Sequence, residues 1–484
     1  MDEPGPAPWW SRELARAYWI PPVLIAFALS RWRLGRPALW RDELYTWDRA
    51  TQPVADILGV LHGVESVFVP YYLFMHCWID LVGASPAELR LPSALAMTAA
   101  AGVVAVLARH LFTPATGVVA GAVFTSVPAI SRMGQEAKPH MFAVLFAALA
   151  TLLLVRALDR PRWSRWLPYA AACSLVGFSH LLALVMLLGH GVTVLALARR
   201  RNRGVVVTWA AAAVGSTLPV LGLAVAGFAH RGPMAWLPLT SAQSVHDLPV
   251  RLISGSIYHL PGAALLAGLL LTVGFLSVAG QGRASWILAP LALVPPVVLL
   301  GAGLVQHVYH PRYLLYTVVA WSVLVAATLV RLPAVLAIAL GVAIVVLGLP
   351  SQLSHRGPAG HGDGGVDAVA AVLVADGRTG DGVVLQGSAG DWLALGIDYH
   401  RARLSHGGAS GPDLAAARCA TGPACRVDAL RLWVVCLGRH RDALDCLSPA
   451  EAAAVRQGYR AAPVRVDRDD RFTLALFQPV PPPS

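Results

Sequence analysis

Long apolar stretches recur along the first 350 residues, and they constrain the fold more than any other feature of the sequence. A helix that crosses a bilayer needs about 17–25 mostly apolar residues. We find such stretches at 17–32, 92–110, 115–131, 140–157, 166–180, 181–198, 205–229, 262–282, 285–304, 313–330 and 332–350. Only 13% of the residues are charged, about half the fraction usual in soluble domains. The sequence therefore predicts a polytopic α-helical membrane protein with about eleven transmembrane helices.

A further apolar stretch, 66–82, contains a proline, two tyrosines, a histidine and an aspartate. Arginine clusters at 156–165 and 199–203 decide its assignment. Both clusters fall on the cytoplasmic side only if 66–82 does not span and the N-terminus is cytoplasmic. We therefore expect 66–82 to be an amphipathic helix in the first outer loop and the C-terminal tail to be extracytoplasmic. The net charge of +11 follows this positive-inside pattern and does not indicate nucleic acid.

The tail after the last span changes in character. Residues 1–350 form the predicted membrane domain, 351–365 read as a Gly-rich linker, and 366–484 as an extracytoplasmic α/β domain. The periodicity predicts helices at 366–376 and 448–459, and strands at 382–386, 431–437 and 472–478. The tail lacks a nucleophile motif and a Gly-rich phosphate loop. We expect it to bind an acceptor polysaccharide or to pack over the active site.

Four of the six cysteines lie close together in this tail: Cys419, Cys425, Cys436 and Cys446. Tight spacing in a soluble segment favours disulfides in an oxidising compartment, and zinc is the competing interpretation. We expect the pairs Cys419–Cys425 and Cys436–Cys446, although spacing alone does not fix the connectivity.

Carboxylates are absent from all the predicted spans and gather in the first outer loop, residues 33–91. Ion-coupled carriers usually keep acids near the bilayer centre, so the sequence argues against a carrier. Asp42 and Glu43 are adjacent there, among three aromatic residues: Trp40, Tyr45 and Trp47. Two interpretations stay open, namely a solvated loop with aromatic interface anchors, or a general base in a partly desolvated pocket.

Other polar residues collect in the remaining predicted outer loops. Lys138, in the segment S-R-M-G-Q-E-A-K-P-H, could contact a phosphate or belong to a short hydrated hairpin. Arg312 begins a span, where it could snorkel to lipid headgroups or bind one particular phosphate. His180 sits at a break in the long stretch 166–198, a place where histidine more often bonds a helix end than catalyses.

These residues occur in an ordered set of motifs: W-R-D-E-L at 40–44, P-Y-Y-L-F-M-H-C-W at 70–78, L-R-L-P-S-A-L at 89–95, G-Q-E-A-K-P-H at 134–140, F-S-H-L at 178–181 and H-P-R-Y-L-L at 310–315. Over about residues 15–350 the chain resembles the GT-C class of integral membrane glycosyltransferases. The nearest group is the protein-mannosyltransferase-like and aminoarabinose-transferase-like superfamily of bacterial polyprenyl-linked sugar transferases.

The resemblance implies inverting transfer of a sugar, with mannose expected, from a polyprenyl phosphate to a glycan, lipid or protein acceptor at the outer face of the plasma membrane. Asp42 would be the general base, Glu43 a supporting acid, and Arg312 and Lys138 would stabilise the leaving phosphate. The full set expected to contact substrate is Glu65, Tyr71, Tyr72, Gln135, Glu136, Lys138, His180, Trp236, Arg312 and Tyr313. No metal ligands are assigned; relatives of this class differ on metal use, so a divalent metal stays open.

Two positions depart from the usual pattern of the class. Phe68 stands where a histidine is usual, and Lys138 stands where an arginine is usual. The second change replaces a bidentate phosphate grip by a point charge. The alternatives to a transferase are a lipid-linked glycan transporter and a non-catalytic envelope-binding membrane protein.

Overall fold

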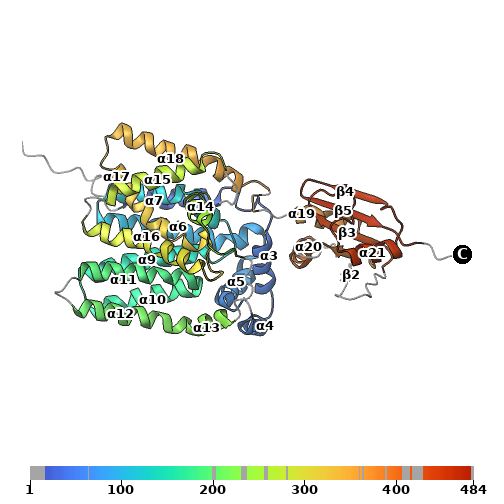
Figure 1. Cartoon of the computed structure of the whole chain (residues 1–484), viewed down its shortest axis with the longest axis horizontal. Coiled ribbons are helices and arrows are strands. Elements are labelled where there is room, and N and C mark those ends of the chain that lie inside the picture. Colours follow the sequence, from blue (N-terminus) through green and yellow to red (C-terminus); the bar gives the residue numbers. More distant parts are fainter. Residues whose placement is uncertain are drawn as a thin grey trace, which may run out of the picture. The chain divides into compact units, whose positions relative to one another are not determined.

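The computed structural model describes residues 17–63, 65–198, 203–229, 237–255, 260–278, 282–358, 360–361, 365–386, 390–405, 415–416 and 429–480. The chain divides into two compact units (Figure 1). The membrane unit comprises Met1–Leu34, Gln52–Gly83 and Ala87–His355. The C-terminal unit joins Gly35–Thr51 and Ala84–Pro86 to Arg356–Ser484.

Among its described residues, the regular elements of the membrane unit are all helices. Its first half contains α2 (Ile20–Arg31), α4 (Val54–Gly59), η1 (Val60–His62), η2 (Ser66–Phe68), α5 (Val69–Val82), α6 (Pro86–Leu111), α7 (Pro114–Ser126), α8 (Pro128–Met133), α9 (His140–Asp159) and α10 (Trp163–Ser179). Its second half contains η3 (Leu181–Val185), α11 (Met186–Leu197), α12 (Arg203–Thr217), η4 (Leu218–Val220), α13 (Leu221–Ala229), α14 (Ala242–Ser254), α15 (Ala263–Val278), α16 (Arg283–Gly303), η6 (Pro311–Leu314), α17 (Thr317–Leu329) and α18 (Ala334–His355).

Each apolar stretch of the sequence is helical in the structure, although some stretches contain more than one of these helices, and the chain is a polytopic membrane protein. Among the described residues, five helices are long and apolar enough to cross a bilayer: Pro86–Leu111, His140–Asp159, Arg203–Ala229, Arg283–Gly303 and Ala334–His355. Six shorter apolar helices accompany them, including Ser66–Val82. The count of eleven spans and the interfacial position of 66–82 stay predictions.

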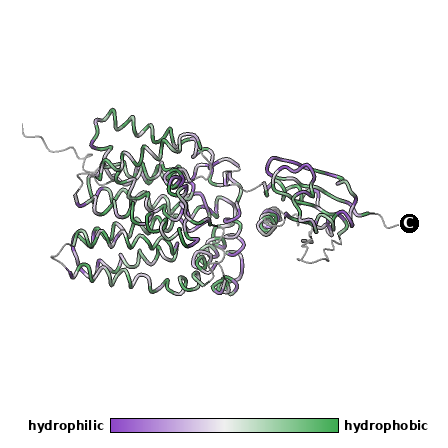
Figure 2. Tube along the Cα trace, in the orientation of Figure 1, coloured by the Kyte–Doolittle hydropathy of each residue, from purple (hydrophilic) through white to green (hydrophobic). Residues whose placement is uncertain are grey.

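The core of the membrane unit centres on α17, which packs against α7, α15 and α16. All 13 residues of α17 are buried. In contrast, α12–α13 and α18 expose most of their apolar side chains, and the bundle helices are hydrophobic along most of their length (Figure 2). A helix that is apolar all round but buried on one side is expected at the lipid boundary of a bundle.

Two local features of the bundle are explained by prolines. Pro92 lies inside α6 and cannot donate to the carbonyl of Glu88; the indole N–H of Trp78 donates to that carbonyl instead, at 2.9 Å. The expected span 115–131 is two helices, because α7 ends at Ser126 and α8 begins at Pro128, where the residue before a proline favours extended backbone.

The C-terminal unit contains a five-stranded sheet with the strand order β2-β1-β3-β5-β4. The strands are β1 (Gly382–Leu385), β2 (Ala415–Ala416), β3 (Leu432–Leu437), β4 (Arg465–Arg468) and β5 (Phe472–Phe477). β1 pairs in parallel with β2 and β3, whereas β5 is antiparallel to β3 and β4. The helices are α3 (Arg41–Ala50), α19 (Val366–Asp376), α20 (Gly390–Ser405) and α21 (Pro449–Gly458).

Alternating side chains of the central strand β3 separate two hydrophobic cores. Trp433 and Val435 pack with α19 and α20, while Val434 and Cys436 pack with α21. This period-two alternation is what a strand covered on both faces requires. Cys436 and Cys446 form a disulfide, as expected; Cys419 and Cys425 lie outside the described residues.

The boundaries of the two units differ from those expected from the sequence. The expected linker 351–365 is shorter, because α18 continues through Pro350 to His355. The segment Gly35–Thr51, expected in the membrane domain, belongs by its contacts to the C-terminal unit. There α3 packs on α20, with the rings of Trp47 and Tyr399 edge to face at 5.1 Å.

Candidate functional site

The two adjacent acids of the first loop lie in the first turn of α3. Acidic residues are favourable in this turn because the helix dipole places partial positive charge there. The Asp42 side chain is 18% exposed and lies 3.6 Å from the guanidinium of Arg41. Asp42 is therefore partly accessible from outside the protein.

Glu43 has a different environment from its neighbour. Its side chain is fully buried, and so is that of His361, whose Nδ1 lies 3.4 Å from Glu43 Oε2. The same carboxylate oxygen accepts the backbone N–H of Trp40. A carboxylate removed from water requires such partners, so Glu43 acts first as an anchor of α3 within the C-terminal unit.

A cluster of basic side chains forms within the membrane unit around His140, at the first residue of α9. Lys138, His180, His310 and Arg312 all act on His140 electrostatically. Lys138 and His140 are each only 6% exposed. The cluster thus brings together the two cations predicted from separate motifs, Lys138 and Arg312, and it has the composition of an anion site.

Aromatic contacts hold this cluster together. The ring of Tyr313 lies 4.5 Å from that of His180 and 5.6 Å from that of His310. His180 is the residue at which α10 ends, with φ −162° and ψ 105°, so the predicted break in the stretch 166–198 occurs there. Its Nδ1 is buried and has no hydrogen-bond partner among the described residues.

Two of the predicted substrate contacts have protein partners in the structure. Gln135 is 1% exposed, and its Nε2 donates to the carbonyls of Ser30 and Trp32 at 2.9 Å each. It therefore satisfies backbone groups at the end of α2 that the helix leaves open. Glu136, also 1% exposed, lies 3.3 Å from the guanidinium of Arg132, so both residues hold the loop that carries Lys138.

The remaining predicted contacts of the first loop lie close to one another. The hydroxyl of Tyr72 donates to Glu65 at 3.2 Å, and the Tyr71 ring packs against Phe142 of α9 at 6.2 Å. The ammonium of Lys138 lies 5.0 Å from the centre of the Phe68 ring. Trp236 lies outside the described residues.

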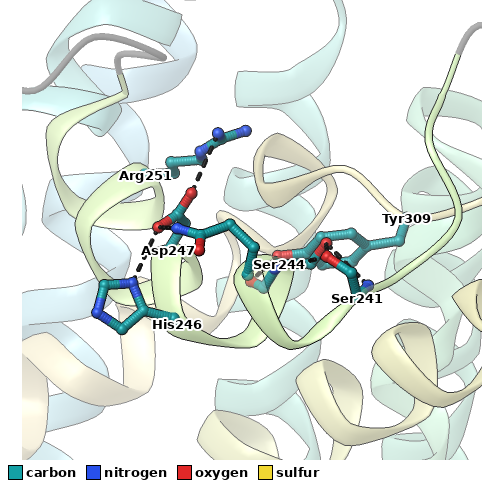
Figure 3. A network of polar contacts seen from close by, with 7 residues as sticks. Ser241, Ser244, His246, Asp247, Arg251 and Tyr309 are labelled. Atoms are coloured by element: carbon teal, nitrogen blue, oxygen red, sulfur yellow. Dashed lines mark hydrogen bonds and ion pairs between the residues drawn. The ribbon is translucent and has the colours of Figure 1, made fainter.

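A second polar network lies on α14, which packs against the η6 segment that carries Arg312. Asp247 of α14 is bound by Gln243 at 2.6 Å, by His246 at 3.0 Å and by Arg251 at 3.2 Å (Figure 3). The hydrogen bond from His246 is the largest cause that lowers the pKa of Asp247. Figure 3 also shows Tyr309, whose hydroxyl donates to the Ser244 carbonyl at 3.5 Å.

Further contacts attach the residues before α14 to the segment 303–307, and the end of α14 to the rest of the bundle. The backbone N–H of Thr240 donates to the carbonyl of Gly303 at 2.8 Å, and His307 binds the carbonyl of Leu237 at 2.5 Å. Arg132 donates to the carbonyl of Gly255, which ends α14 in a left-handed conformation. The approach to Arg312 is therefore held on several sides.

Sequence reasoning missed three residues of these arrangements: His140, His310 and His361. His140 and His310 stand within the recognised motifs, so their positions beside Lys138 and Arg312 were an available signal. His361 lies in a Gly-rich segment and offered none. Among the described residues, no three His, Cys, Asp or Glu side chains lie close enough together to hold a metal ion.

Known proteins share this fold. The model of the family described as dolichyl-phosphate-mannose-protein mannosyltransferase matches residues 68–223. ArnT from Cupriavidus metallidurans in the apo state is similar with a TM-score of 0.61 and 13% identity, over 96% of this chain and 98% of that one. ArnT bound to undecaprenyl phosphate gives a TM-score of 0.56 at the same identity and coverage.

A third structure extends the comparison. The oligosaccharyltransferase of Archaeoglobus fulgidus in the apo form has a TM-score of 0.54 and 13% identity, over 80% of this chain and 64% of that one. No curated protein matches the sequence. The resemblance to GT-C class membrane glycosyltransferases that the motifs predicted is thus confirmed by a family model and by the fold.

Proposed function

We propose that this protein is a membrane glycosyltransferase that moves a sugar from a polyprenyl-phosphate donor to an acceptor of the cell envelope. The observation that carries the proposal is the meeting of Lys138 and Arg312 around His140, at the ends of membrane helices. A lipid phosphate needs cations at this depth while its tail stays in the bilayer. The ArnT structure with undecaprenyl phosphate supports this class of donor.

The proposed reaction is a single displacement with inversion. The acceptor hydroxyl attacks the anomeric carbon, its proton passes to the carboxylate of Asp42, and the bond to the phosphate oxygen breaks. The polyprenyl phosphate leaves with the bonding electrons. Lys138 and Arg312 stabilise the negative charge that grows on this phosphate, which is where preorganised cations lower a barrier most.

The sugar and its acceptor are the finer part of the proposal. We propose mannose, because the family model that matches residues 68–223 describes mannosyltransferases. The resemblance of the motifs to the aminoarabinose-transferase-like group makes aminoarabinose the competing donor sugar. The acceptor is a glycan, lipid or protein at the outer face. The N-terminus is cytoplasmic and the C-terminal domain extracytoplasmic in this proposal, because the positive-inside rule places the arginine clusters inside.

The remaining predicted residues take supporting roles. Glu65, held by Tyr72, orients sugar hydroxyls, and Tyr71 lines the pocket with Trp236. His180 and Tyr313 shape the phosphate cluster through their ring contact. Gln135 and Glu136 position Lys138 by fixing its loop, and Glu43 positions Asp42 by fixing α3.

The test is transfer of label from radiolabelled polyprenyl-phosphate-mannose into membrane glycans. We compare the wild type, Asp42→Asn and a deletion strain, and we expect one labelled product to disappear in both mutants. Asp48→Asn is the matched control, since Asp48 lies on the same helix α3 and has no proposed role. Normal transfer by a correctly inserted Asp42→Asn protein would overturn the assignment of the base.

A second comparison separates the donor from the chemistry. Arg312→Gln is expected to lower transfer from every polyprenyl-phosphate sugar, because Arg312 is proposed to contact the phosphate that all these donors share. Replacing mannose by arabinose, glucose or galactose changes only the sugar contacts. Transfer from another donor sugar, lost in Arg312→Gln, would correct the sugar and retain the class of donor.

A further inference from the structure

Two open hollows of the membrane unit meet at Arg156, near the end of α9 that lies opposite His140. One, of about 610 Å³, lies where α6, α9 and α10 come together, and its basic side chains include Arg156, Arg160 and Arg165. The other, of about 520 Å³, runs between α2, α6 and α9 and is lined by apolar side chains apart from Thr98 and Arg156. A charged hollow thus continues into an apolar groove.

The charged hollow has an excess of positive charge. Its one acid, Asp159, is already bound by His110 at 2.5 Å and by Arg283 at 2.5 Å. Within the described ranges, no carboxylate lies within ion-pair distance of Arg156, Arg160 or Arg165. Guanidinium groups that converge without an acidic partner favour a phosphate, which they bind in a bidentate manner.

The length of the apolar groove identifies the kind of phosphate. Along α6 the groove runs from Leu95 to Val106, which is about 16 Å at the rise of an α-helix. The hydrocarbon core of a bilayer is about 30 Å thick, so one leaflet is about 15 Å deep. The groove therefore fits one acyl chain of one leaflet, with its headgroup at the arginines.

We propose that this double hollow binds an anionic diacyl phospholipid of the leaflet that the arginine distribution predicts to be cytoplasmic. The phosphate contacts Arg156, Arg160 and Arg165, and one acyl chain lies in the groove beside Ala99. The site is separate from the basic cluster around His140 and does not depend on the proposed transferase activity. A lipid bound here joins α2, α6, α9 and α10 at the inner ends of the bundle.

The experiment uses the full-length protein in detergent and measures lipid retention by native mass spectrometry, with thermal unfolding as a second measurement. The probes are dioleoylphosphatidylglycerol, dioleoylphosphatidylcholine and inorganic phosphate. One basic residue near an anionic surface is worth roughly a factor of five, so Arg156→Gln weakens phosphatidylglycerol retention about fivefold and the triple glutamine variant on the order of 100-fold. Arg156→Lys keeps the charge but loses the bidentate contact, so we expect retention between those of the wild type and Arg156→Gln.

Two control variants separate this site from the general attraction of basic loops for lipid. Arg203→Gln removes an exposed arginine of the same predicted face, and we expect wild-type retention. Ala99→Phe fills the groove and lowers retention, whereas Ala339→Phe on the exposed face of α18 does not. An equal loss of phosphatidylglycerol retention in Arg156→Gln and Arg203→Gln would overturn the proposal. It would also be overturned if inorganic phosphate alone raised the unfolding temperature and did so equally in the wild type and in Ala99→Phe.

Discussion

The helix that carries Asp42 is held by a histidine more than 300 positions away in the sequence, and this contact makes a quantitative prediction. Nδ1 of His361 lies 3.4 Å from Glu43 Oε2, with both side chains fully buried. A hydrogen bond to a charged group contributes about 1.5–3 kcal/mol, and 3.4 Å is longer than the usual N–H···O distance of about 2.7–3.2 Å. We therefore expect His361→Ala to remove about 1.5 kcal/mol of the free energy that holds α3 in place.

This loss bears on α3 and hence on Asp42, one residue away from Glu43. A change of about 1.4 kcal/mol is a factor of ten in an equilibrium, so we expect kcat for sugar transfer to fall about tenfold. The KM for the lipid donor stays unchanged, because the proposed phosphate contacts, Lys138 and Arg312, are not altered. His361→Gln keeps a donor near Glu43 and restores most of the rate.

A double-mutant cycle in the same transfer assay provides the decisive comparison. Once Glu43→Gln has removed the charge, the further change His361→Ala lowers kcat by a smaller factor than it does in the wild type. His62→Ala, at an exposed histidine, is the matched control. If His361→Ala has the kcat of the wild type in the same assay in which Asp42→Asn is inactive, the positioning role of His361 is refuted. The assignment of Asp42 as the base is then unaffected.

Three further predictions concern the C-terminal unit. Burial alone raises the pKa of Asp381, but its hydrogen bonds, above all from Arg431 at 2.6 and 2.9 Å, lower the pKa below its usual value. The stability that this ionised group contributes is thus present above pH of about 4 and is lost as the pH falls further. Asp381→Asn should lower the free energy of unfolding by about 3 kcal/mol at pH 7 and flatten the acid side of a pH–Tm curve. Reduction of Cys436–Cys446, which closes a loop with a sequence separation of 10, should cost about 3 kcal/mol and lower Tm in the presence of reductant, whereas a Cys436→Ser/Cys446→Ser variant should be insensitive to it. A methyl group on Gly396 would lie 2.3 Å from a side-chain carbon of α19, so Gly396→Ala should lose about 1–3 kcal/mol by overpacking; an unchanged Tm would contradict that close approach.

Hydropathy located the apolar helices of the membrane unit, because apolar length is the dominant constraint on a chain in a bilayer, but it did not locate the more polar helix α14. It also placed α19, β1, β3, α21 and β5 in the tail, where the patterns are strong. It missed β4, an edge strand of sequence R-V-D-R, because a solvated edge needs no apolar alternation. It missed α20 as well, because charged residues interrupt the apolar ones along D-W-L-A-L-G-I-D-Y-H-R.

The position of α3 within the C-terminal unit was beyond any local signal. Its contacts are long-range: Glu43 with His361 and Trp47 with Tyr399. Such contacts depend on how the chain returns after the last membrane helix, which no window of neighbouring residues encodes. By contrast, Lys138 and Arg312 could be assigned to one site, because counting spans places both loops on the same side of the membrane.

The two departures from the usual motif pattern of the class are best understood as one change. Considered separately, Phe68 in place of histidine and Lys138 in place of arginine each suggest a weakened site. In the structure the Lys138 ammonium lies 5.0 Å from the centre of the Phe68 ring, which is within the range of a cation–π contact. The contact holds a flexible lysine in a defined position and partly replaces the rigidity of a guanidinium fork. The altered pair therefore retains a fixed positive charge beside His140, and the departures give no reason to regard the chain as inactive.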